Sequence, residues 1–109
     1  MCEEMIKFRE LLDANGIEWW DSSTKYHNEE EEDYLGIFKI DRTHFHHRDY
    51  DWSVINGYGT FGGYGYFKSN AGFLELMSNA VNEGNPVGWL TAEEAFALVK
   101  GDNEWTDRF

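Results

Sequence analysis

Apolar residues recur at helical spacing near both ends of the chain. The first segment predicts a helix over residues 3–14, and Asn15-Gly16 is a typical stop after it. Its apolar positions share one face: Met5, Phe8, Leu11 and Leu12. Near the other end, Thr91 and Glu94 have the spacing of a capping box and begin a helix that Gly101 closes.

Between these helices, short apolar and aromatic runs alternate with turn residues. They predict strands over residues 17–21, 34–46, 51–56 and 87–90. The glycine–aromatic stretch at 57–66 predicts a turn or an irregular hairpin. Phe73, Leu74, Met77 and Val81 have helical spacing and predict another helix over residues 72–81.

The predicted order of elements is therefore α-β-β-β-α-β-α. Short links join the middle strands, so these strands should pair antiparallel. The expected fold class is α+β, a small antiparallel sheet of about four strands with three helices packed on one face. We expect one domain over residues 1–109, an acidic loop at 22–33, and a loosely structured tail at 102–109.

Charge is the most unusual feature of the composition. Lys and Arg total 9 and Asp and Glu total 21, which gives a net charge of −12. The apolar fraction of 41% still favours a folded chain. Residues 1–36 carry −8 and residues 73–109 carry −5, whereas residues 37–72 carry +1. Such a chain is repelled by nucleic acid and anionic membranes and attracted to basic protein surfaces, or the acidity serves solubility alone.

The sequence contains no recognisable catalytic signature. Cys2 is the single cysteine and has no neighbouring base, and Ser53 and Ser78 lack a nucleophile-elbow context. We expect no enzyme activity and no cofactor. There is no apolar run of bilayer length and no signal-peptide core, so we expect a cytoplasmic protein without a membrane partner.

The first candidate site is the acidic run Glu29, Glu30, Glu31, Glu32 and Asp33, flanked by Tyr26 and Tyr34. Closely spaced carboxylates can imitate phosphates and occupy a basic nucleic-acid channel. The alternative is a solvated loop without a partner.

The second candidate site lies in the nearly neutral centre and would bind an anionic small ligand such as a nucleotide. Its residues are Arg42, His44, His46, Arg48, Tyr58, Phe61 and Tyr64. His44 and His46 share one face of a strand and, with Asp49 or His27, could hold zinc, but the spacing is not that of a known site and we assign no metal. Gly57, Gly59 and Gly62 spell GxGxxG, but no helix follows directly, so a structural turn is the better interpretation.

Two segments, FRELLDANGIEWWD at residues 8–21 and PVGWLTAEEAFALV at residues 86–99, resemble a loose group of small phage and prophage proteins. The resemblance covers about 28 of the 109 residues and brings no known site. It implies an accessory phage product in the host cytoplasm. We therefore expect an anti-CRISPR-like inhibitor that mimics nucleic acid and binds a basic host protein or ribonucleoprotein, without binding nucleic acid itself.

Overall fold

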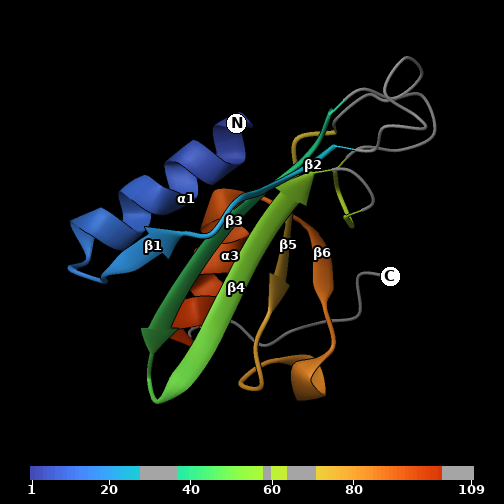
Figure 1. The fold of residues 1–109 in the computed structure, drawn as a ribbon. Helices are drawn as coiled ribbons and strands as arrows, with labels where there is room; N and C mark the ends of the chain where they lie inside the picture. Colours follow the sequence, from blue (N-terminus) through green and yellow to red (C-terminus); the bar gives the residue numbers. More distant parts are fainter. Residues whose placement is uncertain (28–36, 58–59, 64–70, 102–109) are drawn as a thin grey trace.

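A computed structural model describes residues 1–27, 37–57, 60–63 and 71–101 of the chain (Figure 1). The described elements, in chain order, are α1 (Glu3–Ala14), β1 (Trp19–Asp21), β2 (Thr24–His27), β3 (Ile37–His47), β4 (Tyr50–Gly57), β5 (Leu74–Met77), the short 3-10 helix η1 (Asn82–Gly84), β6 (Val87–Leu90) and α3 (Ala92–Lys100).

All strands pair antiparallel in one sheet, in the order β1-β3-β4-β5-β6. β2 pairs with the same side of β3 as β1 does, so six strands occupy five positions across the sheet. The predicted α+β class is confirmed. The predicted counts are wrong, because the described residues form five strand positions rather than four and two α-helices rather than three.

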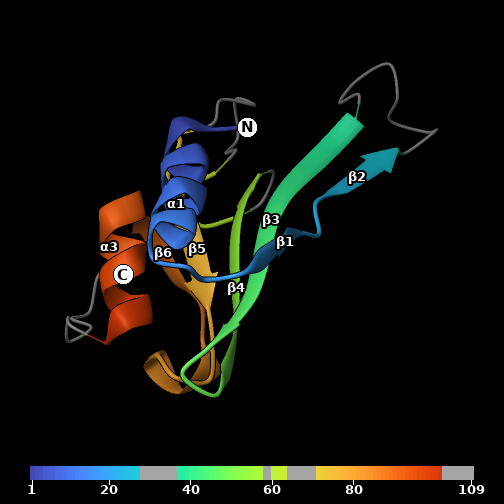
Figure 2. The same ribbon diagram turned by 90° about the vertical axis from the view of Figure 1, so that its left-hand side faces the viewer.

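Both helices cover the same face of the sheet (Figure 2), as predicted. Alternate residues of β3 and β4 point toward them, including Phe45, Trp52 and Val54, which are fully buried. α1 and α3 complete this core with Met5, Phe8, Leu12, Ala95, Phe96, Leu98 and Val99. The opposite face, called the open face below, has no helix of the described part of the chain against it.

The ends of both helices follow the local chemistry of the sequence. Gly16 follows α1 at φ +68°, and Gly101 ends α3 at φ +76°. The Thr91 side chain accepts from the Glu94 N–H at 3.2 Å, and the Glu94 carboxylate accepts from the Thr91 N–H at 3.0 Å. The predicted boundaries of the first helix and the predicted capping box are confirmed.

The helix predicted over residues 72–81 is wrong, because Leu74–Met77 form β5. Leu74 and Leu76 are both fully buried, as a strand with a core side requires, while Met77 is exposed. Phe73, Leu74, Met77 and Val81 have helical spacing by coincidence, and pairing with β4 and β6 overrides it. β2 likewise forms inside the predicted loop at 22–33, because β3 extends beyond β1 and offers an edge for pairing.

A two-residue turn joins β3 to β4 and connects the sheet to the last helix. His47 pairs with Tyr50, and Arg48 and Asp49 between them have φ of +53° and +64°, as in a type I′ hairpin. The Arg48 guanidinium donates to the carbonyl of Val99 at 2.9 Å and lies 5.7 Å from the centre of the Trp52 ring. Arg48 thereby satisfies a free carbonyl at the end of α3.

Candidate functional site

The residues of the first candidate site lie mostly outside the described part of the chain. This holds for the acidic run at residues 29–33 and for Tyr34. Tyr26 belongs to β2, where its backbone pairs with that of Phe38. The role of the acidic run in partner binding therefore stays a prediction.

Three residues of the second candidate site lie together on the open face. Arg42, His44 and His46 alternate along β3 with the buried Asp41, Thr43 and Phe45. Arg48 is separated from them, since it lies in the hairpin turn and contacts α3. Tyr58 and Tyr64 lie outside the described residues.

His44 belongs to a row of four residues that crosses the open face. The four residues are paired from strand to strand across β1, β3, β4 and β5, in the order Trp20, His44, Ser53 and Met77. The rings of Trp20 and His44 are 4.7 Å apart, and the Trp20 side chain is 49% exposed. Trp20 was not among the predicted site residues. Side chains alternate along residues 19–21, so Trp19 and Trp20 must lie on opposite faces of the sheet.

The histidines do not form a metal centre in the described part of the chain. His46 Nδ1 lies 3.1 Å from an oxygen of Asp51 on the adjacent strand, and Asp49 belongs to the hairpin turn. Among the described residues, no group of three His, Cys, Asp or Glu side chains is close enough to hold a metal ion.

Phe61 belongs to a turn that bonds to the last strands. Its N–H donates to the Glu75 carboxylate at 2.9 Å, and its carbonyl accepts from the Trp89 N–H at 3.2 Å. Gly88 lies directly against Phe61, where a Cβ would collide with the Phe61 side chain. The described glycines of the GxGxxG stretch thus belong to a structural turn, closed by the Thr60 N–H donating to the Gly57 carbonyl at 3.2 Å.

A second charged feature lies on the helix side, where the first turns of α1 and α3 meet. The Glu4 carboxylate accepts from the Ala92 N–H at 2.8 Å, so it occupies the N-terminus of α3 as well as that of α1. The Lys7 ammonium nitrogen lies 3.6 Å from a carboxylate oxygen of Glu3 and 3.7 Å from one of Glu4. The negative charge of Glu3 raises the pKa of Lys7 most, that of Glu4 next, and that of Glu93 least.

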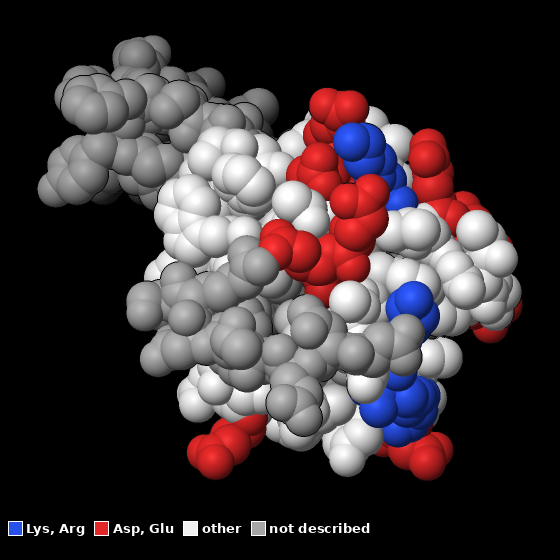
Figure 3. Space-filling view, turned by 180° about the vertical axis from the view of Figure 1, so that it is seen from behind, with Lys and Arg blue, Asp and Glu red and all other residues white. Residues whose placement is uncertain are grey.

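We call Glu3, Glu4, Glu10 and Glu93 the acidic helix surface. Figure 3 shows acidic side chains gathered over this side of the molecule, with few basic ones among them. Glu3 is 81% exposed and Glu4 20% exposed. Acidic residues of the first and the last helix thus meet on one surface of the described part of the chain.

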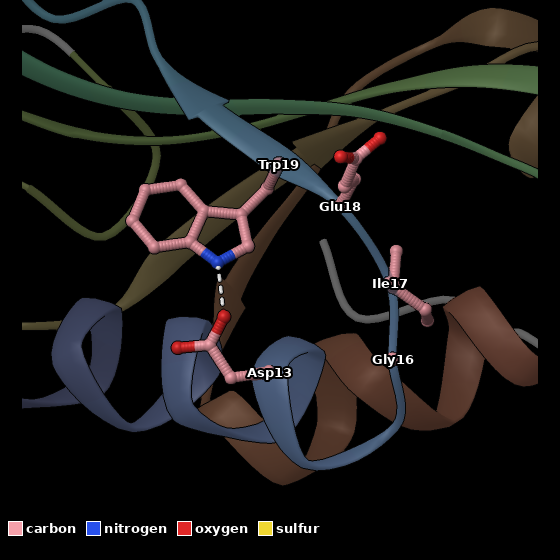
Figure 4. A pocket seen from close by; sticks show the side chains of 5 residues that line it. All are labelled: Asp13, Gly16, Ile17, Glu18 and Trp19. Carbon is pink, nitrogen blue, oxygen red and sulfur yellow. Dashed lines mark hydrogen bonds between the residues drawn. The ribbon is translucent and has the colours of Figure 1, made fainter.

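The third feature is a hollow of about 440 Å³ beyond the end of α1, lined by Asp13, Gly16, Ile17, Glu18 and Trp19. In Figure 4 the Asp13 carboxylate points toward Trp19, whereas the Glu18 side chain projects away from Asp13 and Trp19. The Trp19 indole N–H donates to the Asp13 carboxylate at 2.9 Å.

Arg9 holds Trp19 and the edge of the sheet in place. Its guanidinium lies 4.6 Å from the centre of the Trp19 ring and donates to the Thr43 hydroxyl at 2.7 Å. It also lies 3.4 Å from an oxygen of Asp21, which carries the balancing charge. The hydroxyl of Ser23 and its N–H lower the pKa of Asp21.

Neither helix of the described residues combines the length and apolar character that crossing a bilayer requires. In comparisons with protein families, curated proteins and solved structures, no family model, curated sequence or structure matches this chain.

Proposed function

We propose that this protein is a binding protein that attaches its acidic helix surface to a basic surface of a partner. The observation that carries the proposal is the meeting of Glu3, Glu4 and Glu93 at one place, from helices at opposite ends of the chain. Lys7 is the basic side chain that the structure pairs with them, which leaves this surface strongly negative.

The arrangement favours recognition of a basic partner for two physical reasons. The carboxylates project from helices whose backbone is already ordered, so binding costs the conformational entropy of the side chains and not that of the backbone. An exposed surface of one charge sign also accelerates association with a surface of the opposite sign. Binding of this kind should weaken with salt, because exposed charges are screened over about 8 Å at physiological ionic strength.

The partner that we propose is a nucleic-acid-handling complex of a bacterial host, inhibited in the manner of an anti-CRISPR protein. Surfaces that hold DNA or RNA are rich in Lys and Arg and accept an acidic mimic. The phage-like sequence segments at residues 8–21 and 86–99 are the reason for proposing a host-defence target. The run Glu29–Asp33 would add further carboxylates for the same basic partner.

A pull-down from bacterial lysate at low and high salt tests this proposal. We expect one nucleic-acid-binding complex that is recovered at low salt, lost at high salt, and released by added DNA or RNA. The variant E3Q/E10Q/E93Q should lose most of the recovery. The control E83Q/D49N/D51N removes the same number of charges elsewhere and should retain it.

Equal recovery by these two variants would overturn the assignment to the acidic helix surface. A separate variant with Glu29–Asp33 neutralised tests the loop. If that variant alone loses recovery, the loop rather than the helices binds the partner.

A second candidate function is binding of a nucleotide-like ligand on the open face. The contact between Trp20 and His44, with Arg42 and His46 on the same strand face, favours it, because a ring and cationic groups together suit a base and a phosphate. Calorimetry against a nucleotide panel tests it. Binding should be lost in Trp20→Ala and kept in Trp89→Ala, since Trp89 is equally exposed at 48% but lies elsewhere.

A further inference from the structure

We propose that the open face of the sheet binds the open face of a second copy of this chain, which gives a reversible dimer with twofold symmetry. Figure 1 views this face directly, with β3 and β4 in front of α3. The inference does not rest on the proposed function, because the acidic helix surface lies on the opposite side of the sheet (Figure 2). It uses the same face as the second candidate function, so a ligand bound to Trp20 would exclude the second copy.

The row of Trp20, His44, Ser53 and Met77 gives the open face an exposed apolar side chain at each end. Trp20 is 49% exposed and Met77 is 44% exposed. His44 and Ser53, which lie between them, are half-buried. Neighbouring strands lie about 4.8 Å apart, so the two apolar ends are about 14 Å apart along the row. Covering both ends with a second apolar surface removes them from water and is favourable.

The order of these four residues makes the row complementary to itself. A twofold axis that runs parallel to β3 and β4, between His44 and Ser53, reverses the order of the row in the second copy. Trp20 of each copy then faces Met77 of the other, and His44 faces Ser53. A methionine sulfur packs favourably on an aromatic ring, and an imidazole can form a hydrogen bond with a hydroxyl group. Each side chain of the row thus meets a suitable one from the same sequence.

The distribution of charge favours this face for contact between copies. The chain carries −12, so two copies repel each other where their acidic surfaces meet. On the open face, Arg42 and Asp51 have opposite charges. Glu75 is only 8% exposed, and its carboxylate accepts from the Phe61 N–H. The accessible part of the open face is therefore close to neutral, and a second copy meets least repulsion there.

The size of the open face limits the strength of the dimer. Five strand positions and strands with up to eight paired residues give a face on the order of 500 Å² per copy. Stable complexes bury about 800 Å² per partner. We therefore expect a weak dimer, with a dissociation constant between about 10 μM and 1 mM. Its two acidic helix surfaces lie on opposite outer sides, so the dimer presents the proposed binding surface twice.

Sedimentation equilibrium of the full chain between about 1 μM and 1 mM tests this inference. We expect the average mass to rise reversibly toward that of a dimer. Added salt should strengthen this association, because it screens the repulsion between two chains of −12 each. Capture of a basic partner should weaken under the same conditions, so the response to salt separates this contact from the proposed function.

The variants W20K and M77E should each weaken dimerisation by about tenfold or more, because each places a charge against an apolar side chain. The double variant W20K/M77E should dimerise more strongly than either single variant, because the twofold axis brings the opposite charges face to face. W89K is the control, since Trp89 is equally exposed at 48% but lies outside the row, and it should dimerise like the wild type. W89K/M77E has the net charge of W20K/M77E and should dimerise as weakly as M77E.

A chain that stays monomeric up to about 1 mM would overturn the inference, as would W20K and M77E variants that dimerise like W89K. A double variant W20K/M77E that associates no better than W20K and M77E would show that the twofold pairing of Trp20 with Met77 is wrong. These results leave the proposed function untouched, because E3Q/E10Q/E93Q tests it separately through capture of the partner.

Discussion

Replacing Arg9 by methionine should lower the free energy of unfolding by about 3 kcal/mol, because Arg9 joins α1 to the edge of the sheet. Its side chain is 11% exposed and donates to the Thr43 hydroxyl and to the carbonyl of Arg42 at 3.2 Å. Methionine keeps most of the apolar stem and removes the charged donors. The change therefore measures the polar contacts of Arg9 rather than the loss of packing.

The magnitude follows from the individual contacts. Hydrogen bonds from a charged donor each contribute about 1.5–3 kcal/mol, and the fully buried Thr43 hydroxyl loses one of its partners. The cation–π contact with Trp19 adds about 0.5–1 kcal/mol. The ion pair with Asp21 adds at most about 1 kcal/mol, since the Asp21 side chain is 52% exposed. The methionine variant avoids the cost of removing a guanidinium group from water, and this gain offsets part of the total.

Urea unfolding followed by tryptophan fluorescence and circular dichroism provides the measurement. The expected loss corresponds to a fall in Tm of roughly 12–15 °C for a domain of this size. Lys7→Met is the matched control, because it removes an exposed cation from the same helix and should change stability by less than about 0.5 kcal/mol. If Arg9→Met changed stability no more than Lys7→Met does, the bridging role of Arg9 would be refuted.

Four further predictions concern local features of the fold. Thr91→Ala removes the acceptor for the Glu94 N–H and should cost about 1 kcal/mol in the same urea assay. Asp49→Gly should raise Tm by roughly 2–4 °C, because glycine adopts a positive φ without strain. The pKa of Asp21 is lowered in the fold, so the stability that its charge contributes is present above its unfolded pKa and is lost as the pH falls through its folded pKa. In thermal melts between about pH 2 and 5, Asp21→Asn should therefore make the fall of Tm with decreasing pH less steep. Burial raises the pKa of the Cys2 thiol, so iodoacetamide at about pH 8 should alkylate it more slowly in the native protein than in urea.

The sequence predicted those elements whose signals are local. The apolar period of α1 and the Thr91–Glu94 capping box depend on residues within a few positions of each other, and both helices form where expected. β5 was missed because its four residues are too few to show alternation. Its Glu75 is nearly buried and bonded to Phe61, a contact that only the tertiary structure provides.

The functional features depended more on pairing and packing than on motifs. Alternation correctly placed His44 and His46 on one face, but only the register of β1 against β3 puts Trp20 beside His44. The acidic helix surface joins Glu4 to Ala92 over 88 positions of sequence, and no pattern along the chain indicates which helices become neighbours.

The contact between Glu4 and Ala92 also constrains the order in which the molecule can fold. The β3–β4 hairpin is local and can form within microseconds. α1 can pack against β3 as soon as both are present, because Phe8 contacts Phe45 and Arg9 contacts Thr43. Its second neighbour, α3, is added only when residues 92–100 have been synthesised, and the Arg48 contact with the Val99 carbonyl forms only then. Until then, the part of α1 that packs against α3 stays exposed to chaperones and proteases during synthesis. A ribosome-bound chain that ends before residue 92 should therefore be cleaved by protease faster than one that includes residues 92–100.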